Sequence, residues 1–177
     1  MKLLVAYASK YGSTAEIAEV VGQELRKREV EVEVKPVDQV SNLAGYDGFV
    51  IGSALYAGGW LKPAADFLRS NQDVLAGRLV WLFSSGPTGE SDPNEILGGW
   101  SFPEDLADVV KRIKPREIIL FHGKIDLDKL SPGEKMIIQS VKATVGDYRD
   151  WLVIRSWARL LQLEPAANTE NLLADNP

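Results

Sequence analysis

The chain has 177 residues, 45% of them hydrophobic and 25% charged, and a formal net charge of −5 at pH 7. This length suits one domain with a full core and is short for two, and an acidic chain without a basic stripe disfavours nucleic acid as a partner. The chain has no cysteine and one histidine, which excludes disulfides and Cys-ligated metal centres and leaves little for a histidine site, so we predict no metal. Any redox chemistry must therefore be carried by a bound organic cofactor.

Membrane insertion is not expected. The sequence has no run of 18 apolar residues, and the N-terminal stretch MKLLVAYASKYG is too short an apolar run for a signal peptide. We therefore expect a cytoplasmic protein with no transmembrane segment, and peripheral membrane contact and the oligomeric state stay open.

Strand-like runs alternate with helical patterns along the chain. The strands are expected at Lys2–Ala8, 30–37, 48–54, 78–84 and 117–122, and the helices at 15–28, 61–71, 104–113 and 148–163. Residues 30–35 alternate strictly between valine and charged residues, which is typical of an edge strand, whereas 49–51 and 79–83 are nearly continuously apolar. We predict an α/β fold with a doubly wound five-stranded parallel sheet in the order 2-1-3-4-5, helices on both faces, and a ligand at the carboxyl ends of strands one and three.

The turn after the first strand has residue types that suit a phosphate cradle. It consists of Ser9, Lys10, Tyr11, Gly12, Ser13 and Thr14, and a predicted helix follows at once. Backbone N–H groups at a helix N-terminus lack intrahelical partners, and the hydroxyls add further donors. Neither GxxxxGKS/T nor GxGxxG follows the strand, which favours a monophosphate. The alternative is an ordinary helix start, with Ser13 as the N-cap and Glu16 completing a capping box.

Two further loops, after the third and fourth strands, carry residue types that suit a planar ring. The first contains Ala54, Leu55, Tyr56, Ala57, Gly58, Gly59 and Trp60, and the second contains Ser84, Ser85, Gly86, Pro87, Thr88 and Gly89. Tyr56 and Trp60 are candidates for stacking on a flat heterocycle, and the second loop offers turn formers and backbone donors for ring carbonyls. The alternative for Trp60 is an anchor that holds the following helix on the sheet.

Taken together, the three loops make the chain resemble the flavodoxin-like FMN-binding family over roughly residues 1–160, because 9–14 follows the pattern S/T-x-T/Y-G-N/S-T. Within that family it is most similar to flavodoxin-domain proteins related to menaquinone-dependent protoporphyrinogen dehydrogenase, through 50–54, 81–87 and 146–151. The resemblance implies an FMN whose phosphate is held by Ser9, Tyr11, Gly12, Ser13 and Thr14, with 56–60 on one side of the ring and 85–89 on the other. Lys10 departs from an all-neutral cradle, and the sequence leaves open whether it adds charge to the phosphate site or points into solvent.

Residues 123–147 form a connection much longer than the usual two to six residues, so we predict an insertion with a functional role before the last helix. Its lysines and apolar side chains suit a cover over an apolar or anionic substrate. The alternative is that 136–138 and Val141 form a helical turn packed on the sheet. The domain is expected to span 1–163, followed by a polar tail at 164–177.

The resemblance implies an FMN-dependent oxidoreductase that takes electrons from a reduced organic substrate, such as a porphyrinogen, and passes them to a quinone or another acceptor. One alternative is a flavodoxin-type carrier that exchanges electrons with redox protein partners, and another is an interaction module without flavin. Outside the three loops, His122 is expected to satisfy a nearby carbonyl rather than act as a proton shuttle. Arg149 and Asp150 are expected to make contacts at a helix start, with an anionic substrate as the alternative partner of Arg149.

Overall fold

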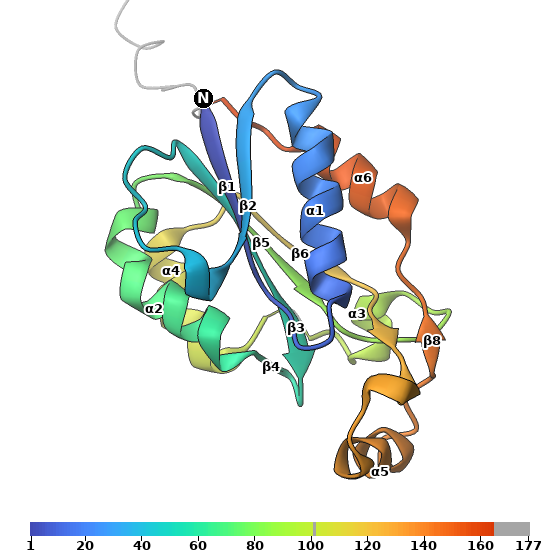
Figure 1. Ribbon diagram of the computed structural model, residues 1–177. Helices are drawn as coiled ribbons and strands as arrows, with labels where there is room; N and C mark the ends of the chain where they lie inside the picture. Colours follow the sequence, from blue (N-terminus) through green and yellow to red (C-terminus); the bar gives the residue numbers. More distant parts are fainter. Residues whose placement is uncertain (101, 165–177) are drawn as a thin grey trace, which may run out of the picture.

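The computed structural model describes residues 1–100 and 102–164, which form a central parallel sheet with helices on both faces (Figure 1). The strands of the sheet are β1 (Lys2–Ala8), β2 (Glu31–Pro36), β3 (Gly48–Tyr56), β5 (Leu79–Ser85) and β6 (Glu117–Phe121), in the order β2-β1-β3-β5-β6. All neighbours on this path are parallel. The predicted order 2-1-3-4-5 and the α/β fold class are thereby confirmed. A short strand, β4 (Gly59–Trp60), adds an antiparallel pair to the end of β3.

The central strands are covered on both faces, which explains their nearly continuous apolar sequences. In β1, alternate side chains serve the two faces: Leu3 and Val5 belong to one core, and Leu4 and Ala6 to the other. In the sheet as described, β2 pairs only with β1, and its Glu31 is exposed, so the alternating run forms an edge strand as predicted.

Two helices cover each face of the sheet (Figure 1). One face carries α1 (Ser13–Arg26) and α6 (Trp151–Leu160), and the other carries α2 (Lys62–Leu75) and α4 (Ala107–Ile113). In α1 the buried residues include Ile17, Val21 and Leu25, whose spacing of four places them on one side of the helix. Within residues 1–100 and 102–164, no helix has both the length and the apolar character needed to cross a bilayer.

A buried carboxylate joins the two helices on the first face. Glu24 of α1 is 1% exposed, and its carboxylate accepts hydrogen bonds from Arg155 Nη1 (2.8 Å) and Arg159 Nε (2.7 Å) of α6. Lys27 Nζ donates to the same carboxylate at 2.8 Å. These three cations hold the pKa of Glu24 at about 2, well below the ordinary 4.5, with the bond from Arg159 as the largest cause.

Local capping and burial set the helix bounds, which differ from the predicted ones by a few residues. Helix α6 begins at Trp151 rather than at 148, because the Asp150 carboxylate accepts hydrogen bonds from the backbone N–H groups of Leu152 and Val153. Helix α2 continues past the predicted end at 71 as far as Leu75, whose side chain is fully buried. The helix predicted at 104–113 begins as a 3-10 turn (Glu104–Leu106) and continues as α4. The sequence pattern does not predict the 3-10 turn Val37–Gln39 or the short helix α3 (Pro93–Ile96).

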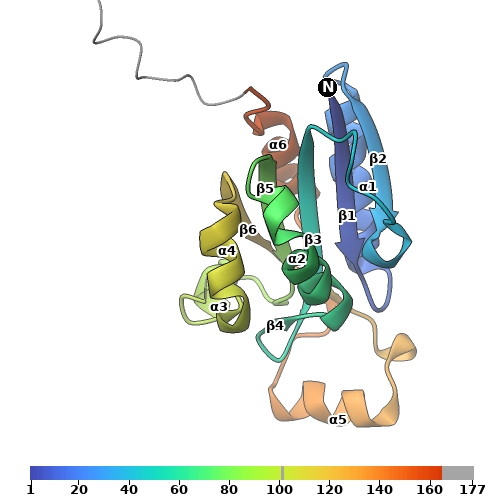
Figure 2. The ribbon, with the colours of Figure 1, turned by 90° about the vertical axis from the view of Figure 1, so that its left-hand side faces the viewer.

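The insertion at 123–147 is a separate substructure at the carboxyl ends of the strands (Figures 1 and 2). Strands β7 (Lys124–Ile125) and β8 (Gly146–Asp147) pair antiparallel as its stem, and between them lie a 3-10 turn (Leu127–Lys129) and α5 (Pro132–Ser140). No residue of α5 is buried. The helical turn predicted around 136–138 is present as part of α5. The prediction that this turn packs on the sheet is wrong, because none of its residues is buried. Of the predicted tail at 164–177, residues 165–177 lie outside the described residues.

Candidate functional site

A cavity of about 740 Å³ lies at the carboxyl ends of β1, β3 and β5, between three loops and the insertion. Of the predicted site residues, Tyr11, Ser13, 54–58 and 85–89 line it, whereas Ser9, Lys10, Gly12, Thr14, Gly59, Trp60 and Ser84 are not part of its lining. The strand order reverses between β1 and β3 at this place, and open α/β sheets bind ligands at such a switch point. The volume is within the range of small-molecule and cofactor sites.

No side chain of the described residues caps the start of α1. Gly12 is the N-cap residue, and its φ of 93° is a left-handed conformation that glycine adopts without steric cost. Its backbone N–H donates to Ser9 Oγ at 3.0 Å, which closes the turn. Glu16 pairs with Arg149, whose Nη1 donates to Glu16 Oε2 at 2.7 Å, so the alternative of a capping box from Ser13 is wrong. The first turn of α1 keeps the donors that a phosphate requires.

The loop after β3 is a tight hairpin. Tyr56 pairs with Gly59, which leaves Ala57 and Gly58 as a two-residue turn. Both turn residues have positive φ, 50° and 78°, the signature of a type I′ turn. Tyr56 borders the cavity and is 41% exposed, so its ring is available for a planar ligand.

Trp60 is a core residue and does not border the cavity. It is 7% exposed, its Nε1–H donates to Ser84 Oγ at 2.8 Å, and its ring meets Phe102 edge-on with centroids 4.9 Å apart. This environment favours the alternative that Trp60 anchors the following helix over the predicted stacking on a ligand ring. The physical reason is the alternation of side chains along β4, which turns Trp60 inward beside the glycine that precedes it.

Backbone groups pack closely between the loop after β5 and its neighbours. A Cβ on Gly86 would lie 2.8 Å from Leu55 Cβ, and a Cβ on Gly123 would lie 2.6 Å from Gly86 O, so both positions require glycine. The Pro87 carbonyl accepts a hydrogen bond from Gly123 N at 2.9 Å. These contacts fix the loop after β5 against the β3 hairpin and the start of the insertion.

Three buried hydroxyls at these loops have no hydrogen-bond partner among the described residues. They belong to Thr14 (0% exposed), Ser85 (3%) and Thr88 (7%). Among the described residues, the other buried side-chain atom without a hydrogen-bond partner is Trp157 Nε1, on the core-facing side of α6. Buried polar groups in native proteins are nearly always hydrogen-bonded, so each of these hydroxyls calls for a partner. Ser85 and Thr88 line the cavity, where a ligand would meet them, and Thr14 lies on the predicted phosphate loop 9–14.

One face of α5 forms the side of the cavity opposite the sheet. Glu134, Ile137, Ile138 and Val141 line it at the spacing i, i+3, i+4 and i+7. Ile137 and Val141 are 60% and 64% exposed, so this apolar face has no protein partner in the described part of the chain. The apolar spacing within 137–141 is a sequence signal for such a face, although it does not show which part of the protein the face meets.

Hydrogen bonds join the insertion to the predicted phosphate loop, residues 9–14. Glu134 accepts hydrogen bonds from Lys10 Nζ and from the Tyr11 hydroxyl, each at 2.6 Å, and Lys129 Nζ donates to the Tyr11 carbonyl at 3.3 Å. The bond from Lys10 is the largest cause of a pKa of Glu134 held well below its usual range. Lys10 therefore neither joins the first turn of α1 nor points freely into solvent, because it pairs with the insertion.

Arg149 clamps the far end of the insertion to the same helix. Its side chain is 2% exposed, and Nη1 donates to Ser13 O at 3.1 Å as well as to Glu16. Its Nε and Nη2 donate to the carboxylate of Asp147 in β8 at 2.8 and 2.6 Å, which lowers the pKa of that carboxyl. Arg149 therefore makes its contacts at the start of α1, whereas the start of α6 is capped by Asp150.

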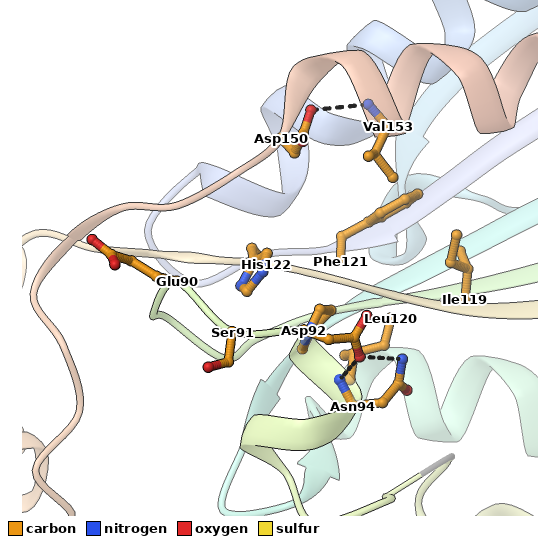
Figure 3. Close-up of a pocket in the computed structure, with 11 residues that line it drawn as sticks. Glu90, Ser91, Asp92, Asn94, Ile119, Leu120, Phe121, His122, Asp150 and Val153 are labelled. Atoms are coloured by element: carbon orange, nitrogen blue, oxygen red, sulfur yellow. Dashed lines mark hydrogen bonds between the residues drawn. The ribbon is translucent and has the colours of Figure 1, made fainter.

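A second cavity, of about 350 Å³, is lined by residues 90–94, by 119–122 at the end of β6, and by Asp150 and Val153 at the start of α6 (Figure 3). Two of its carboxylates already have structural roles, because Asp92 accepts from Asn94 N at the start of α3 and Asp150 caps α6. His122 Nδ1 lies 3.3 Å from the Pro87 carbonyl. The expectation that His122 satisfies a nearby carbonyl is thus confirmed, and the described residues hold no cluster that could bind a metal.

The fold and the larger cavity define a doubly wound α/β protein with a cavity at its topological switch point, where proteins of this architecture bind ligands. Residues 4–151 match the model of the flavodoxin domain family, so the chain belongs to that family. No curated protein sequence matches the chain.

Solved structures with the same fold include several flavodoxins. A short-chain flavodoxin associated with a non-canonical PDU bacterial microcompartment is 17% identical, with a TM-score of 0.57 over 91% of this chain and 96% of that one. The C101S mutant of a flavodoxin from Pseudomonas aeruginosa is 14% identical, with a TM-score of 0.55 over 91% and 99%. Rubredoxin oxygen:oxidoreductase from Desulfovibrio gigas is 15% identical, with a TM-score of 0.58 over 90% of this chain and 35% of that chain. At such identities the likeness is one of fold.

Proposed function

We propose that this protein binds FMN at the cavity and transfers electrons through it. The observation that carries the proposal is the set of unpartnered buried hydroxyls on Thr14, Ser85 and Thr88, which lie on the loops predicted for the phosphate and the ring. A helix start with free N–H groups adds donors for one phosphate, and membership of the flavodoxin domain family agrees with this ligand. The residues present therefore fit FMN.

The roles of the site residues follow from their positions. Ser9, Tyr11, Gly12, Ser13 and Thr14 would hold the phosphate, Tyr56 would contact the ring, and 85–89 would supply donors to its polar edge. FMN, when bound, supplies the electron chemistry, and the protein orients it and tunes its potential through nearby hydrogen bonds and charges. The apolar face of α5 would exclude water from the ring.

We further propose that the electrons come from or go to a small organic molecule, of the quinone or porphyrinogen type suggested by the sequence resemblance. The support is the unpartnered apolar face of α5 across the cavity, which a flat apolar molecule can cover. The alternative is a flavodoxin-type carrier that works only with protein partners, and the solved flavodoxins of the same fold favour it. Activity with quinones and dyes, as opposed to activity only with reductase proteins, separates the two. A cytoplasmic location stays a prediction.

The test of the flavin site compares two buried threonines. Thr14→Val removes a phosphate-loop hydroxyl and should weaken FMN binding by about 1–3 kcal/mol, the cost of a lost charge-assisted hydrogen bond, with riboflavin binding unchanged. Thr88→Val, the matched control in the ring loop, should weaken FMN and riboflavin equally. Flavin fluorescence titration measures both affinities, and the absorbance spectrum of the purified protein shows whether flavin is already bound. Equal affinity of the wild type for riboflavin and FMN would refute the phosphate site.

A further inference from the structure

A carboxylate from the insertion is tied into the phosphate loop. Glu134 accepts hydrogen bonds from Lys10 Nζ (2.6 Å), the Tyr11 hydroxyl (2.6 Å), Ser131 Oγ (2.6 Å) and Ser131 N (3.0 Å). Its side chain is 20% exposed, compared with 46% for Lys10. All four donors meet one carboxylate, which lines the cavity beside Tyr11.

Lys10 is the only cationic residue in the loop 9–14. Its Nζ lies 5.3 Å from the ring centre of Tyr11 and 5.5 Å from that of Tyr56, so the charge stands between the phosphate loop and the β3 hairpin. In this position the Lys10 cation is neutralised by Glu134.

Two other cations, Arg149 and Lys129, lie near the start of α1. The Arg149 guanidinium, which donates to Ser13 O, is paired with Glu16 and Asp147. Lys129 donates to a backbone carbonyl of the loop. Arg149 is thus paired with carboxylates, whereas Lys129 keeps its charge and lies on the insertion. Within the loop 9–14 itself, a phosphate dianion would meet neutral donors, and Glu134 sets whether this loop has a cation to offer.

From this geometry we infer that Glu134 sets the preference of the site for a phosphate-bearing flavin over riboflavin, by neutralising Lys10. The inference rests on the FMN site proposed above. Riboflavin has the same ring and no phosphate, so its binding should not respond to the charge at 134. The affinity for a flavin with an anionic tail should change with the charge at position 134, and more so for a tail with more negative charge. This change in affinity should become smaller as the salt concentration rises.

The variant Glu134→Gln removes the charge and keeps the side-chain length, and glutamine is also accepted at this position of a capping box, so α5 should persist. We expect the dissociation constant of FMN to fall about tenfold at low salt, with that of riboflavin unchanged within about twofold. Glu104→Gln, an exposed site preceding α4, is the matched loss of one negative charge and should leave both constants unchanged.

Lys10→Met completes a double-mutant cycle. Alone it leaves Glu134 without its cation, so FMN binding should weaken several-fold. Combined with Glu134→Gln it should cancel the tenfold gain, because the gain depends on a freed Lys10. Thermal melts check that all variants are folded.

Three outcomes would overturn the inference. Parallel changes for FMN and riboflavin in Glu134→Gln would show that Glu134 only packs the insertion. Weaker FMN binding with unchanged riboflavin binding would show that Glu134 positions Lys10 or Tyr11 for the phosphate and does not act by neutralising Lys10. Unchanged affinities would show no role in binding. If the wild type binds neither flavin, the proposed function fails as well, which the wild-type titration shows by itself.

Discussion

Tyr56 and Trp60 lie in one hairpin but serve different purposes. Tyr56 is 41% exposed and borders the cavity, whereas Trp60 is 7% exposed and donates to Ser84 Oγ inside the core. A buried hydrogen bond of this kind contributes about 0.5–1.5 kcal/mol, and losing one partner costs more because the other stays buried without it. We therefore expect Tyr56 to contribute to ligand binding and Trp60 to contribute to stability.

Substitution separates the two roles. Trp60→Phe should lower the free energy of unfolding by about 1–3 kcal/mol, since Ser84 loses its donor, and should change flavin affinity little. Tyr56→Ala should weaken FMN and riboflavin binding by about 0.5–1.5 kcal/mol, the value of aromatic stacking beyond area burial, with little change in stability. Urea melts and fluorescence titrations measure these quantities. If Trp60→Phe weakened flavin binding and left stability unchanged, Trp60 would be a binding residue after all.

At the scale of elements, the pairing of α1 with α6 depends on charge as well as on apolar burial. Glu24 is nearly inaccessible and receives hydrogen bonds from Lys27, Arg155 and Arg159. A buried carboxylate with several cationic partners is costly to break, because the loss of one member leaves the others uncompensated.

Stability should depend on pH through Glu24. Its pKa is about 2 in the folded protein and ordinarily 4.5, so its contribution is complete above pH 4.5 and is lost as pH falls toward 2. Glu24→Gln should be less stable at pH 7 and should show a shallower fall in unfolding free energy between pH 4.5 and 2. Urea melts across this range measure the difference, with the exposed Glu19→Gln as the control expected to parallel the wild type. Parallel curves for wild type and Glu24→Gln would contradict this role.

The insertion should be dispensable for folding. No residue of α5 is buried, and the pairing of Ile125 with Gly146 brings the ends of the segment together, so a short Gly-rich turn can replace 126–145. Such a variant should melt within a few degrees of the wild type, because the lost ion pair at Glu134 is partly exposed and such pairs contribute about 0–1 kcal/mol. It should still bind flavin.

The same variant tests the substrate cover. If α5 holds a small organic substrate, flavin reduction by that substrate should be lost while flavin stays bound. Stopped-flow absorbance measures the rate. A folded, flavin-loaded variant that reacts at the parent rate would exclude the cover, and an unfolded variant would show that α5 supports the fold.

At the scale of the whole molecule, the sheet separates two cores and leaves the ligand site at one end, where no single element completes it. Loops after β1, β3 and β5 and the insertion all contribute. A ligand that joins four distant segments binds the folded chain and not the unfolded one, so it stabilises the whole domain.

FMN should therefore raise the melting temperature. At a free concentration of 100 times its dissociation constant the stabilisation is about 2.7 kcal/mol, which corresponds to roughly 5–10 °C for a domain of this size. FAD at the same concentration should give a smaller shift, since the phosphate loop lacks the glycines of a pyrophosphate site. Differential scanning fluorimetry measures both, and an equal or larger shift with FAD would contradict a monophosphate cradle.

The sheet could be predicted from the sequence because its determinants are local. The strict alternation at 30–35 marks the edge strand, and continuous apolar runs mark the central strands. The loops 9–14, 54–58 and 85–89 reach the site for the same reason, since carboxyl ends of parallel strands meet at one edge.

What the sequence could not predict depends on three-dimensional contacts. Trp60 has an aromatic side chain of the kind that stacks on planar ligands. Only the direction of this side chain in β4 places it in the core. The apolar spacing on α5 normally indicates packing on a sheet, but the β7–β8 stem holds the helix beyond the strand ends. The pairing of Glu134 with Lys10 spans 124 positions and has no local signal.

The β7–β8 stem also has an evolutionary consequence. Because its two strands are paired, the stretch between them can lengthen, shorten or be exchanged for unrelated sequence without changing the register of the main sheet. The loops that form the floor of the site are constrained by glycine contacts such as that of Gly86 with Leu55, whereas the opposite wall has no such constraint. Replacement of 126–145 alone would therefore change the wall opposite the sheet, together with the contacts that Glu134 and Lys129 make to the loop 9–14, and would leave the glycine contacts of the floor loops in place.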